Sequence, residues 1–361
     1  MNRLLQKLEK IGRDPKVTAK AVGLRYVSDT SPGYTRKRSG KGWSFYDADG
    51  KLVKDKELIA RFNKLVIPPA YTNVWISLYE NGHLQFTGAD AAGRKQYRYH
   101  AGWTQIRNQS KYHRLQTFAS YLPAIREQVD KDLARQILDH EKVVALAIRL
   151  MELTGIRVGN ESYKKLYGSF GLTTLQNRHI KIEGSTLKFE FKGKKGVMHK
   201  VALQSKKLAR LVKQCRDIPG KELFQYYNES GERGSIGSGD INDYLKNITG
   251  EEFTAKDFRT WSGSIRALYA FKAAGEFTSV TECHKKIVSV IDEVAVSLGN
   301  TRSVCKKYYV HPSVIKSYED GTIFKYISKI DEQSDIKAAE LNIAEKALLN
   351  LLETEKLAEA S

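Results

Sequence analysis

The first hundred residues follow the apolar–polar alternation that is typical of β-strands. Three short runs of this kind are Trp43–Tyr46, Val74–Leu78 and Leu84–Phe86. Turn-forming residues separate the runs, and two of the turns, Asp49-Gly50 and Asn81-Gly82, each lie between two apolar runs. We expect both to be hairpin turns in which the glycine takes a positive φ. The pattern predicts a small β-rich domain at the N-terminus.

Beyond about residue 105, apolar positions recur at helical spacing. Over residues 110–153, apolar side chains lie one turn apart on one face. Four later segments with the same spacing are 204–215, 240–249, 262–274 and 281–298. The Ala-, Leu- and Glu-rich tail after Asp335 also has leucines at helical spacing. This tail is either a terminal helix packed on the body or a solvated appendage.

A β-hairpin interrupts the helical pattern. Leu187, Phe189 and Phe191 alternate with charged residues, which indicates a strand. Residues 193–196 (G-K-K-G) then form a turn before a returning strand at 197–203. The sequence therefore predicts an α+β fold. Its parts are a small β-rich N-terminal domain at 1–104, a linker at 105–114, a mostly helical domain with the hairpin at 115–334 and a helical tail at 335–361.

The charge of the chain narrows the range of functions. The sequence has 60 Lys and Arg residues against 41 Asp and Glu residues, which gives a formal net charge of +19. Such an excess repels itself unless a polyanion screens it. Nucleic acid is therefore the leading partner, followed by a membrane surface or an acidic protein. The alternative is that the charge serves only solubility.

The cysteines, histidines and apolar segments argue against several other classes. Cys215, Cys283 and Cys305 are far apart and form no C-x-x-C pair, which argues against a disulfide framework and a structural zinc site. The eight histidines show no H-E-x-x-H spacing. No apolar segment approaches the roughly 18 residues that span a bilayer, and the N-terminal segment does not resemble a signal peptide. We expect a cytoplasmic protein with no metal, no cofactor and no membrane partner.

Cutting a phosphodiester without a metal requires three kinds of group. A nucleophile must attack phosphorus, fixed cations must hold the nonbridging oxygens, and an acid must protonate the departing oxygen. Arginine suits the second task because its permanently charged fork pairs with two oxygens. Lysine suits the third when neighbouring positive charge lowers its pKa. Tyrosine suits the first, because phenolate is also a workable leaving group for resealing.

These residue types occur together in separate motifs. The motifs are T-G-I-R-V-G-N-E at 154–161, the turn lysine Lys194, K-D-F-R-T-W at 256–261, G-N-T at 299–301 and C-K-K-Y-Y at 305–309. Two N-terminal segments accompany them, I-P-P-A-Y at 67–71 and G-R-K-Q-Y at 93–97. Together they resemble the type IB DNA topoisomerases, especially the compact poxviral and bacterial branch, with Cys305 where that family has Ser. The matching positions run from about residue 20 to residue 326.

The resemblance implies a role for each motif. Tyr309, nine residues after Asn300, would attack phosphorus, forming a 3′-phosphotyrosine and freeing a 5′-hydroxyl. Arg157 and Arg259 would hold the nonbridging oxygens, and Lys194 would protonate the leaving 5′-oxygen. Asn300 would donate a hydrogen bond to a nonbridging oxygen, at a position where some members of the family have His and bacterial members have Asn. The reaction would relax supercoiled double-stranded DNA without ATP or metal, and a bilobed monomer would clamp the duplex.

A basic and aromatic segment of the N-terminal domain is the main candidate for DNA contact. Its candidate residues are Arg94, Lys95, Gln96, Tyr97 and Tyr99. Strand alternation is expected to place aromatic and basic side chains on opposite faces. Cations could then bind phosphates while Gln96 and Tyr97 reach base edges. Pattern alone fits an amphipathic edge strand equally well, and the resemblance favours DNA contact. Asn160 and Lys256, in the two arginine motifs, complete the DNA-binding candidates.

Some residue assignments have competitors. The competing residues are Tyr308 for Tyr309 and Lys195 for Lys194. Spacing favours the second tyrosine, and we expect the first to lie in the core. Arg157 could instead be a charge at a helix C-terminus. Arg259 could form a buried ion pair with Asp257.

Two other functions fit part of the pattern. A tyrosine recombinase shares the catalytic residue types, but recombinases usually have H-x-x-R at the second arginine, where this chain has Lys256, and a helical N-terminal domain. A non-catalytic DNA-binding protein would bind in a salt-dependent manner without forming a covalent adduct.

Overall fold

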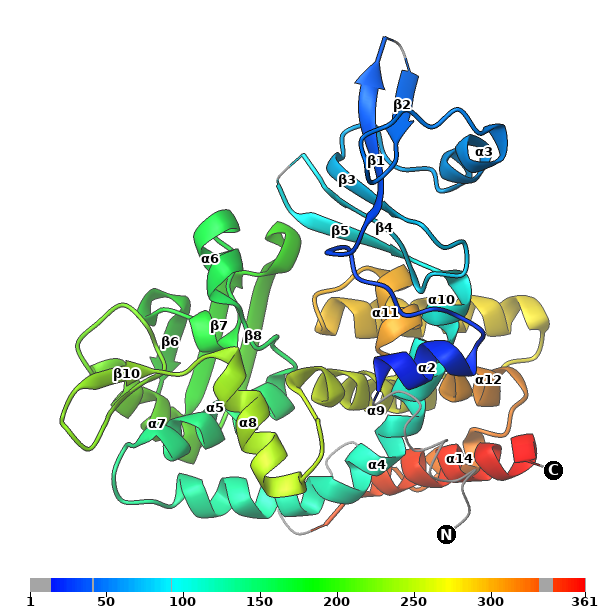
Figure 1. Ribbon diagram of the computed structural model, residues 1–361. Helices are drawn as coiled ribbons and strands as arrows, with labels where there is room; N and C mark the ends of the chain where they lie inside the picture. The colour runs from blue at the N-terminus through cyan, green and yellow to red at the C-terminus, as the bar shows by residue number, and fades with distance from the viewer. Residues whose placement is uncertain (1–13, 41, 92, 331–339, 361) are drawn as a thin grey trace. The chain divides into compact units, whose positions relative to one another are not determined.

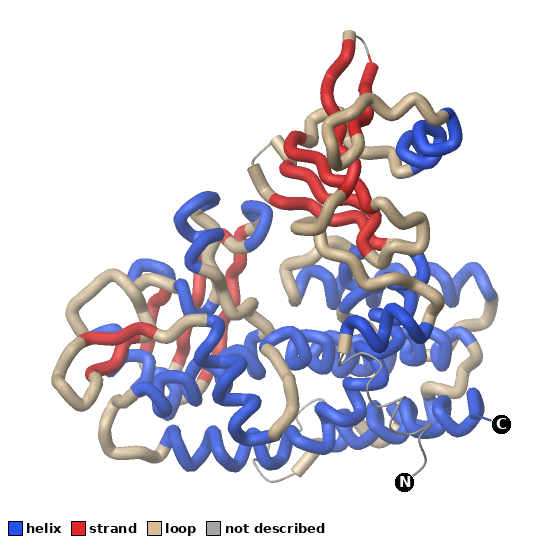
Figure 2. The backbone as a smooth tube through the Cα atoms, viewed as in Figure 1, coloured by secondary structure: helices blue, strands red, loops and turns tan. Residues whose placement is uncertain are grey.

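The computed structural model describes residues 14–40, 42–91, 93–330 and 340–360 (Figure 1). It divides into two compact units, Met1–His113 and Arg114–Ser361. Helices dominate, and the strands form one sheet in the first unit and two smaller sheets in the second (Figure 2). The expected α+β class is confirmed. No described helix combines the length and apolar character needed to cross a bilayer.

The first unit is built on a five-stranded antiparallel sheet with the order β2-β1-β3-β4-β5. Its strands are β1 (Gly33–Ser39), β2 (Gly42–Tyr46), β3 (Thr72–Ser77), β4 (Leu84–Ala89) and β5 (Lys95–Tyr99), and its short helices are α2 (Pro15–Ala21) and α3 (Lys56–Lys64). Phe62 of α3 packs in a core with Phe45 and Ile76 of the sheet. The three apolar runs predicted as strands fall on β2, β3 and β4.

The two expected hairpin turns have different outcomes. Gly50 has φ +79° in the turn after β2, where Tyr46 bridges to Leu52, as predicted. Gly82 does not have a positive φ, so that expectation is wrong. The connection from β3 to β4 is longer than a two-residue turn, and a Cβ at Gly82 would lie 2.5 Å from Ser77 Oγ. Glycine is needed there for space, not for its backbone conformation.

One long helix, α4 (Ala101–Leu133), contains the segment expected to be a linker. Residues 105–114 are helical, and the division between the compact units falls inside this helix. The sequence explains the continuity, because no Gly or Pro occurs between Gly102 and Pro123 to end the helix. The residues expected to link the two domains are therefore helical.

The second unit is mostly helical, with α5 (His140–Thr154) at its centre. Residues 143–148 of α5 are all buried, as expected of a helix that neighbours cover on every side. These neighbours include α7, α8 and α9. The other helices are α6 (Glu161–Tyr167), α7 (Lys206–Asp217), α8 (Ser238–Thr249), α9 (Ala255–Ala274), α10 (Val280–Ser297), α11 (Arg302–Tyr308), α12 (Pro312–Glu319), α13 (Phe324–Ile327) and α14 (Ile343–Ala360).

The predicted hairpin is present in a three-stranded sheet of the second unit. The strands of this sheet are β6 (Ile180–Glu183), β7 (Thr186–Lys192) and β8 (Met198–Gln204), and a separate pair is β9 (Gln225–Tyr227) with β10 (Arg233–Ser235). Leu187, Phe189 and Phe191 of β7 are buried, as their alternation predicts. The turn between β7 and β8 contains η3 (Lys194–Gly196), in which Lys195 has a left-handed φ of +61°.

Of the two possibilities for the C-terminal tail, the packed helix is the one observed. Residues 335–339 of the tail lie outside the described residues. Leu348 and Leu352 of α14 are buried, and α14 packs on α9, α12 and α13. Glu345 of α14 also forms a buried ion pair with Arg126 of α4, with 2.6 Å between Oε1 and Nη2.

Candidate active site

A glycine-rich segment after α5 places Arg157. Gly155 ends α5 with φ +68°, the left-handed conformation that favours glycine at a helix C-terminus. The segment then runs beside the 3₁₀ turn η1 (Leu172–Thr174), where Leu172 N–H donates to Arg157 O at 2.7 Å. The arginine side chain therefore extends from a fixed backbone.

The Arg157 guanidinium contacts the turn after α10. It donates to Asn300 Oδ1 at 2.5 Å and to Gly299 O at 3.4 Å. Gly299 has φ +59°, and Asn300 N–H donates to Ala295 O at 2.8 Å, so the turn is held on the end of α10. These side-chain bonds join segments that are 142 and 143 residues apart. Arg157 is thus bound to a distant turn and is more than a charge at the end of its own helix.

Arg259 lies on α9 and is only 3% exposed. Its guanidinium donates to two main-chain carbonyls, Gly155 O and Leu298 O, the second at 2.9 Å. Asp257, the alternative partner, instead caps the first turn of α9. Burial, together with nearby Arg157, lowers the pKa of Arg259 to about 10. Two guanidiniums therefore lie close together, and their described hydrogen bonds to backbone and amide oxygens leave both charges uncompensated.

One donor of Arg259 is unsatisfied in the part of the chain that the structure describes. Its Nε atom is buried and has no hydrogen-bond partner among the described residues. A buried donor without a partner costs about 1–3 kcal/mol. A ligand oxygen that reached this atom would remove that cost.

Tyr309 follows α11 and faces both guanidiniums. Its ring centroid lies 4.9 Å from Arg259 Cζ, and its hydroxyl hydrogen-bonds with Arg259 and Arg157. Burial raises the pKa of this hydroxyl, but the two arginines outweigh burial and hold the pKa below its usual value. Tyr308 is 38% exposed and lies beside Lys307, so its expected place in the core is wrong. Consecutive residues at a helix end point in different directions, and here only the second tyrosine turns inward.

Lys194 lies at the tip of the β7–β8 hairpin, where the charges of Arg157 and Tyr309 act on it. Its side chain remains accessible, yet reduced hydration beside the site lowers its pKa, and Arg157 lowers that pKa further. Tyr309 opposes this shift. The net effect is a lowered pKa, so Lys194 releases its proton more readily than a lysine in water does.

The second unit thus gathers five of the predicted residues. They are Arg157, Lys194, Arg259, Asn300 and Tyr309. Lys256 lies near enough for its charge to act on Lys194. Asn160 has a structural contact, because its Oδ1 caps α6 by accepting from Tyr163 N–H at 3.1 Å. A ligand would have to displace this cap or use the amide nitrogen of Asn160.

Strand β5 and Arg94, the residue before it, provide the DNA-binding candidates of the first unit, and acidic residues hold several of them. Arg94 Nε is 2.7 Å from Asp90 Oδ2, and Gln96 Nε2 donates to the same oxygen at 2.9 Å. Lys95 Nζ is 2.5 Å from Asp29 Oδ2. These carboxylates order the side chains and also offset part of their positive charge.

The faces of β5 differ from the expectation. Tyr97 and Tyr99 are exposed, and their parallel rings have centroids 6.1 Å apart. Lys95 Nζ lies 5.6 Å from the Tyr97 ring centroid, so the expected separation of cations from aromatic side chains is wrong for Lys95. Residues two apart in a strand point the same way, which places position 95 with positions 97 and 99.

Two small residues that the sequence analysis missed hold the Tyr309 backbone. A Cβ at Gly263 of α9 would lie 2.5 Å from Tyr309 O, so only glycine fits there. Ser264 Oγ is 3.4 Å from Tyr309 O and accepts from His311 N–H at 3.0 Å. Gly263 lies one helical turn after Arg259 and Ser264 follows it, and this pair of small residues is the signal that could have identified them.

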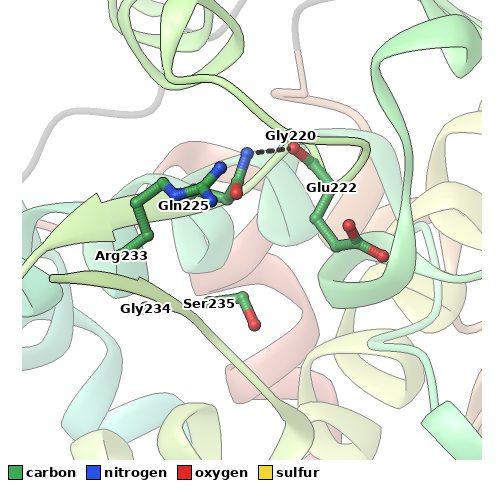
Figure 3. Close-up of a pocket in the computed structure, with 6 residues that line it drawn as sticks. All are labelled: Gly220, Glu222, Gln225, Arg233, Gly234 and Ser235. Atoms are coloured by element: carbon green, nitrogen blue, oxygen red, sulfur yellow. Dashed lines mark hydrogen bonds between the residues drawn. The ribbon is translucent and has the colours of Figure 1, made fainter.

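An open hollow of about 420 Å³ lies apart from this cluster (Figure 3). Its lining is Gly220, Glu222, Gln225, Arg233, Gly234 and Ser235. Gln225 Nε2 donates to Glu222 O at 2.8 Å. The hollow contains none of the predicted site residues.

Two protein-family models match the chain. One, described as eukaryotic DNA topoisomerase I, catalytic core, matches residues 100–337. The other, described as bacterial DNA topoisomerase IB, N-terminal domain, matches residues 42–90. The first match includes every residue of the five-residue cluster.

Viral proteins are similar over most of their length. DNA topoisomerase 1B of Acanthamoeba polyphaga mimivirus is 29% identical over 310 residues, which cover 84% of this chain and 92% of that protein. DNA topoisomerase 1B of vaccinia virus (strain Copenhagen) is 26% identical over 248 residues, covering 68% and 76%. DNA topoisomerase 1 of rabbit fibroma virus is 27% identical over 297 residues, covering 76% and 88%.

Proposed function

The chain belongs to the type IB DNA topoisomerases, because the catalytic-core family matches more than half of it, and we propose that it relaxes supercoiled duplex DNA by cutting and resealing one strand through Tyr309. As a member of this family it is an enzyme that acts on DNA. The observation that carries the proposal is that two guanidiniums hydrogen-bond one tyrosine hydroxyl, while a hairpin lysine lies near enough for the charge of that tyrosine to act on it.

In the proposed cleavage step, the Tyr309 hydroxyl gives its proton to solvent water, and the resulting phenolate oxygen attacks phosphorus. The bond from phosphorus to the 5′-oxygen breaks, and Lys194 gives that oxygen a proton. The products are a 3′-phosphotyrosine and a 5′-hydroxyl, and resealing is the reverse reaction. The pKa of Tyr309, which the two arginines lower from its usual value, supports both directions, because the shift favours phenolate as nucleophile and as leaving group.

Arg157 and Arg259 would stabilise the charge that builds on the nonbridging oxygens. Their bonds to carbonyl and amide oxygens fix the guanidiniums in place without neutralising them. The buried Nε of Arg259 offers a donor that a phosphate oxygen would satisfy. Asn300 Oδ1 accepts from Arg157, so its amide nitrogen is the group that could donate to the phosphate.

The energy source of relaxation follows from this chemistry. One phosphodiester is exchanged for another, so the protein linkage conserves the energy of the broken bond without ATP. Torsional strain in the DNA then drives rotation before resealing. Because the basic strand β5 and the catalytic cluster belong to different compact units, we propose that a monomer holds the duplex with both units.

The test begins with supercoiled plasmid, EDTA and no ATP. Wild-type protein should give relaxed topoisomers and, after denaturation, a protein–DNA adduct whose linked peptide contains Tyr309. Tyr309→Phe should lose the adduct and keep DNA binding, whereas the control Tyr308→Phe should retain cleavage. Recombined products from a defined site would favour a tyrosine recombinase. Tight binding without any adduct from wild-type protein would favour a non-catalytic DNA-binding protein.

A further inference from the structure

A buried histidine lies behind the proposed catalytic residues. His199 is on β8, five residues after Lys194, and is 8% exposed. It pairs across the hairpin with Phe191, and the two rings are parallel, with 5.1 Å between their centroids. This stacking fixes the orientation of the imidazole on the inner face of the hairpin.

The imidazole lies against two tight backbone positions. A Cβ built on Gly193, just before Lys194, would lie 2.5 Å from His199 Cδ2. A Cβ built on Gly299, just before Asn300, would overlap His199 Cε1. His199 therefore separates the backbone that carries the lysine from the backbone that carries the amide, and glycine on each side makes room for the ring.

The two backbone segments that the His199 wedge, meaning its imidazole ring, lies between are anchored differently. The Gly299 side is fixed to α10, because Gly299 N–H donates to Val296 O at 3.0 Å, and Arg157 binds Gly299 O. The described backbone bonds of residues 193–197 are local to the tip, from Gly193 N–H to Val197 O at 2.7 Å and from Gly196 N–H to Gly193 O at 3.0 Å, and a bond from another segment, from Phe170 N–H, reaches only Lys192 O at 2.8 Å. Contact with His199 is thus a direct link between the tip and the fixed turn.

The charge state of the ring suits this position. Burial, together with Arg157 and Arg259, lowers the pKa of His199 to about 4, so the ring is neutral near neutral pH. A neutral ring can occupy a place beside two guanidiniums from which a cation would be repelled.

We propose that His199 is a positioning residue that holds the hairpin tip against the Gly299 turn and thereby sets the reach of Lys194. This inference rests on the proposed function. It concerns the placement of the acid and gives His199 no contact with DNA. A displacement of about 1 Å in such a group can lower a rate about 100-fold.

The test compares His199→Ala with Phe189→Leu in single-turnover cleavage. Phe189 is a buried residue of the same hairpin, farther from the tip, so its variant loses packing without disturbing the wedge. We expect His199→Ala to slow cleavage about 10- to 100-fold while DNA binding stays unchanged, and Phe189→Leu to cleave at the wild-type rate. Equal losses in both variants, or a wild-type rate for His199→Ala, would overturn the proposal.

A second substrate identifies the group that His199 positions. When sulfur replaces the 5′-bridging oxygen, the leaving group is a thiol with a pKa of about 8.5, which can depart as thiolate without an acid. We expect this substrate to restore most of the rate of His199→Ala. If the defect persists with sulfur, His199 does not act through Lys194 and the proposal fails.

A third variant covers the possibility that His199→Ala does not fold, as judged by loss of a cooperative melting transition. In Gly193→Ala, the added methyl group pushes on the His199 ring from the hairpin side. Gly193 has φ −91°, which alanine adopts without strain. We expect the same slow cleavage and the same rescue by sulfur, and normal cleavage would overturn the proposal. If wild-type protein forms no adduct at all, the proposed function fails first, which is a distinct result.

Discussion

The acidity of Tyr309 depends on its two arginine neighbours, which hold its pKa below the usual value against the opposing effect of burial. Arg157→Ala removes one of these charges and should raise that pKa. The phenolate would then form at higher pH, so we expect the acid limb of the pH profile of single-turnover cleavage to move upward. The control is Arg135→Ala, which loses a surface ion pair with Asp139. An unshifted limb in Arg157→Ala would show that Arg157 does not tune Tyr309.

Arg259 combines burial, two carbonyl contacts and one unpaired donor. Because these features would place a donor at the developing charge, Arg259→Ala should slow cleavage by about 10²–10³-fold while duplex binding persists. Arg259→Lys should not restore the rate, because a single ammonium group cannot replace a planar fork with several partners. Cleavage rates with labelled duplex measure both effects. Full activity of the lysine variant would contradict the geometric argument.

The resemblance of the motifs to a known family selected the five clustered side chains but not the residues that support them. Asn300 and Tyr309 are separated by a fixed number of residues, so a linear pattern can identify them. Gly263 and His199 act through contacts with segments distant in sequence. Neither is unusual within its own helix or strand, and only the folded chain shows what each one touches.

At the scale of elements, α14 is joined to the centre of the second unit by a buried cluster of charges. Glu345 binds Arg126 of α4 and accepts from Trp261 Nε1, two residues after Arg259 on α9, at 3.0 Å. Arg126 also pairs with Glu152 of α5. Glu345 of the tail helix therefore contacts α4 and α9 directly and is joined to α5 only through Arg126.

Removal of Glu345 tests how strongly this cluster stabilises the unit. Glu345→Ala leaves Arg126 buried with one carboxylate fewer, so we expect the free energy of unfolding to fall by about 3–5 kcal/mol. Urea denaturation followed by circular dichroism measures the change. The control is Lys131→Ala, which loses only an exposed pair with Glu127 on α4. An unchanged midpoint for Glu345→Ala would mean that water or another group compensates Arg126.

Periodicity predicts which segments are helix or strand better than it predicts their details. The alternating residues of β7 and the apolar residues of α5 are buried where the periods of a strand and a helix predict burial. Periodicity does not predict the backbone conformation of Gly82 or the side of β5 on which the Lys95 side chain lies. Gly82 is set by the crowding of a loop against Ser77, and Lys95 is drawn toward Asp29 on a neighbouring segment.

At the scale of the whole molecule, the net charge of +19 predicts that duplex binding is mainly electrostatic. The logarithm of the affinity should fall linearly with the logarithm of salt concentration, with a slope of about −0.9 for each phosphate contact. Two lysines proposed to contact DNA differ in whether an acidic side chain is paired with them. Lys95 is paired with Asp29, whereas no ion pair is described for Lys256 within the residues that the structure covers.

This difference gives each lysine its own expected effect on the slope. Lys256→Ala should make the slope shallower by about one unit, because a cation without an acidic partner releases a counterion when it meets a phosphate. Lys95→Ala should change the slope less, because Lys95 must leave Asp29 before it can bind DNA. Fluorescence anisotropy at several salt concentrations, in a Tyr309→Phe background that prevents cleavage, measures both slopes. A larger change for Lys95→Ala would show that the duplex breaks its pair with Asp29 and that β5 contributes more to phosphate binding than the second unit does at Lys256.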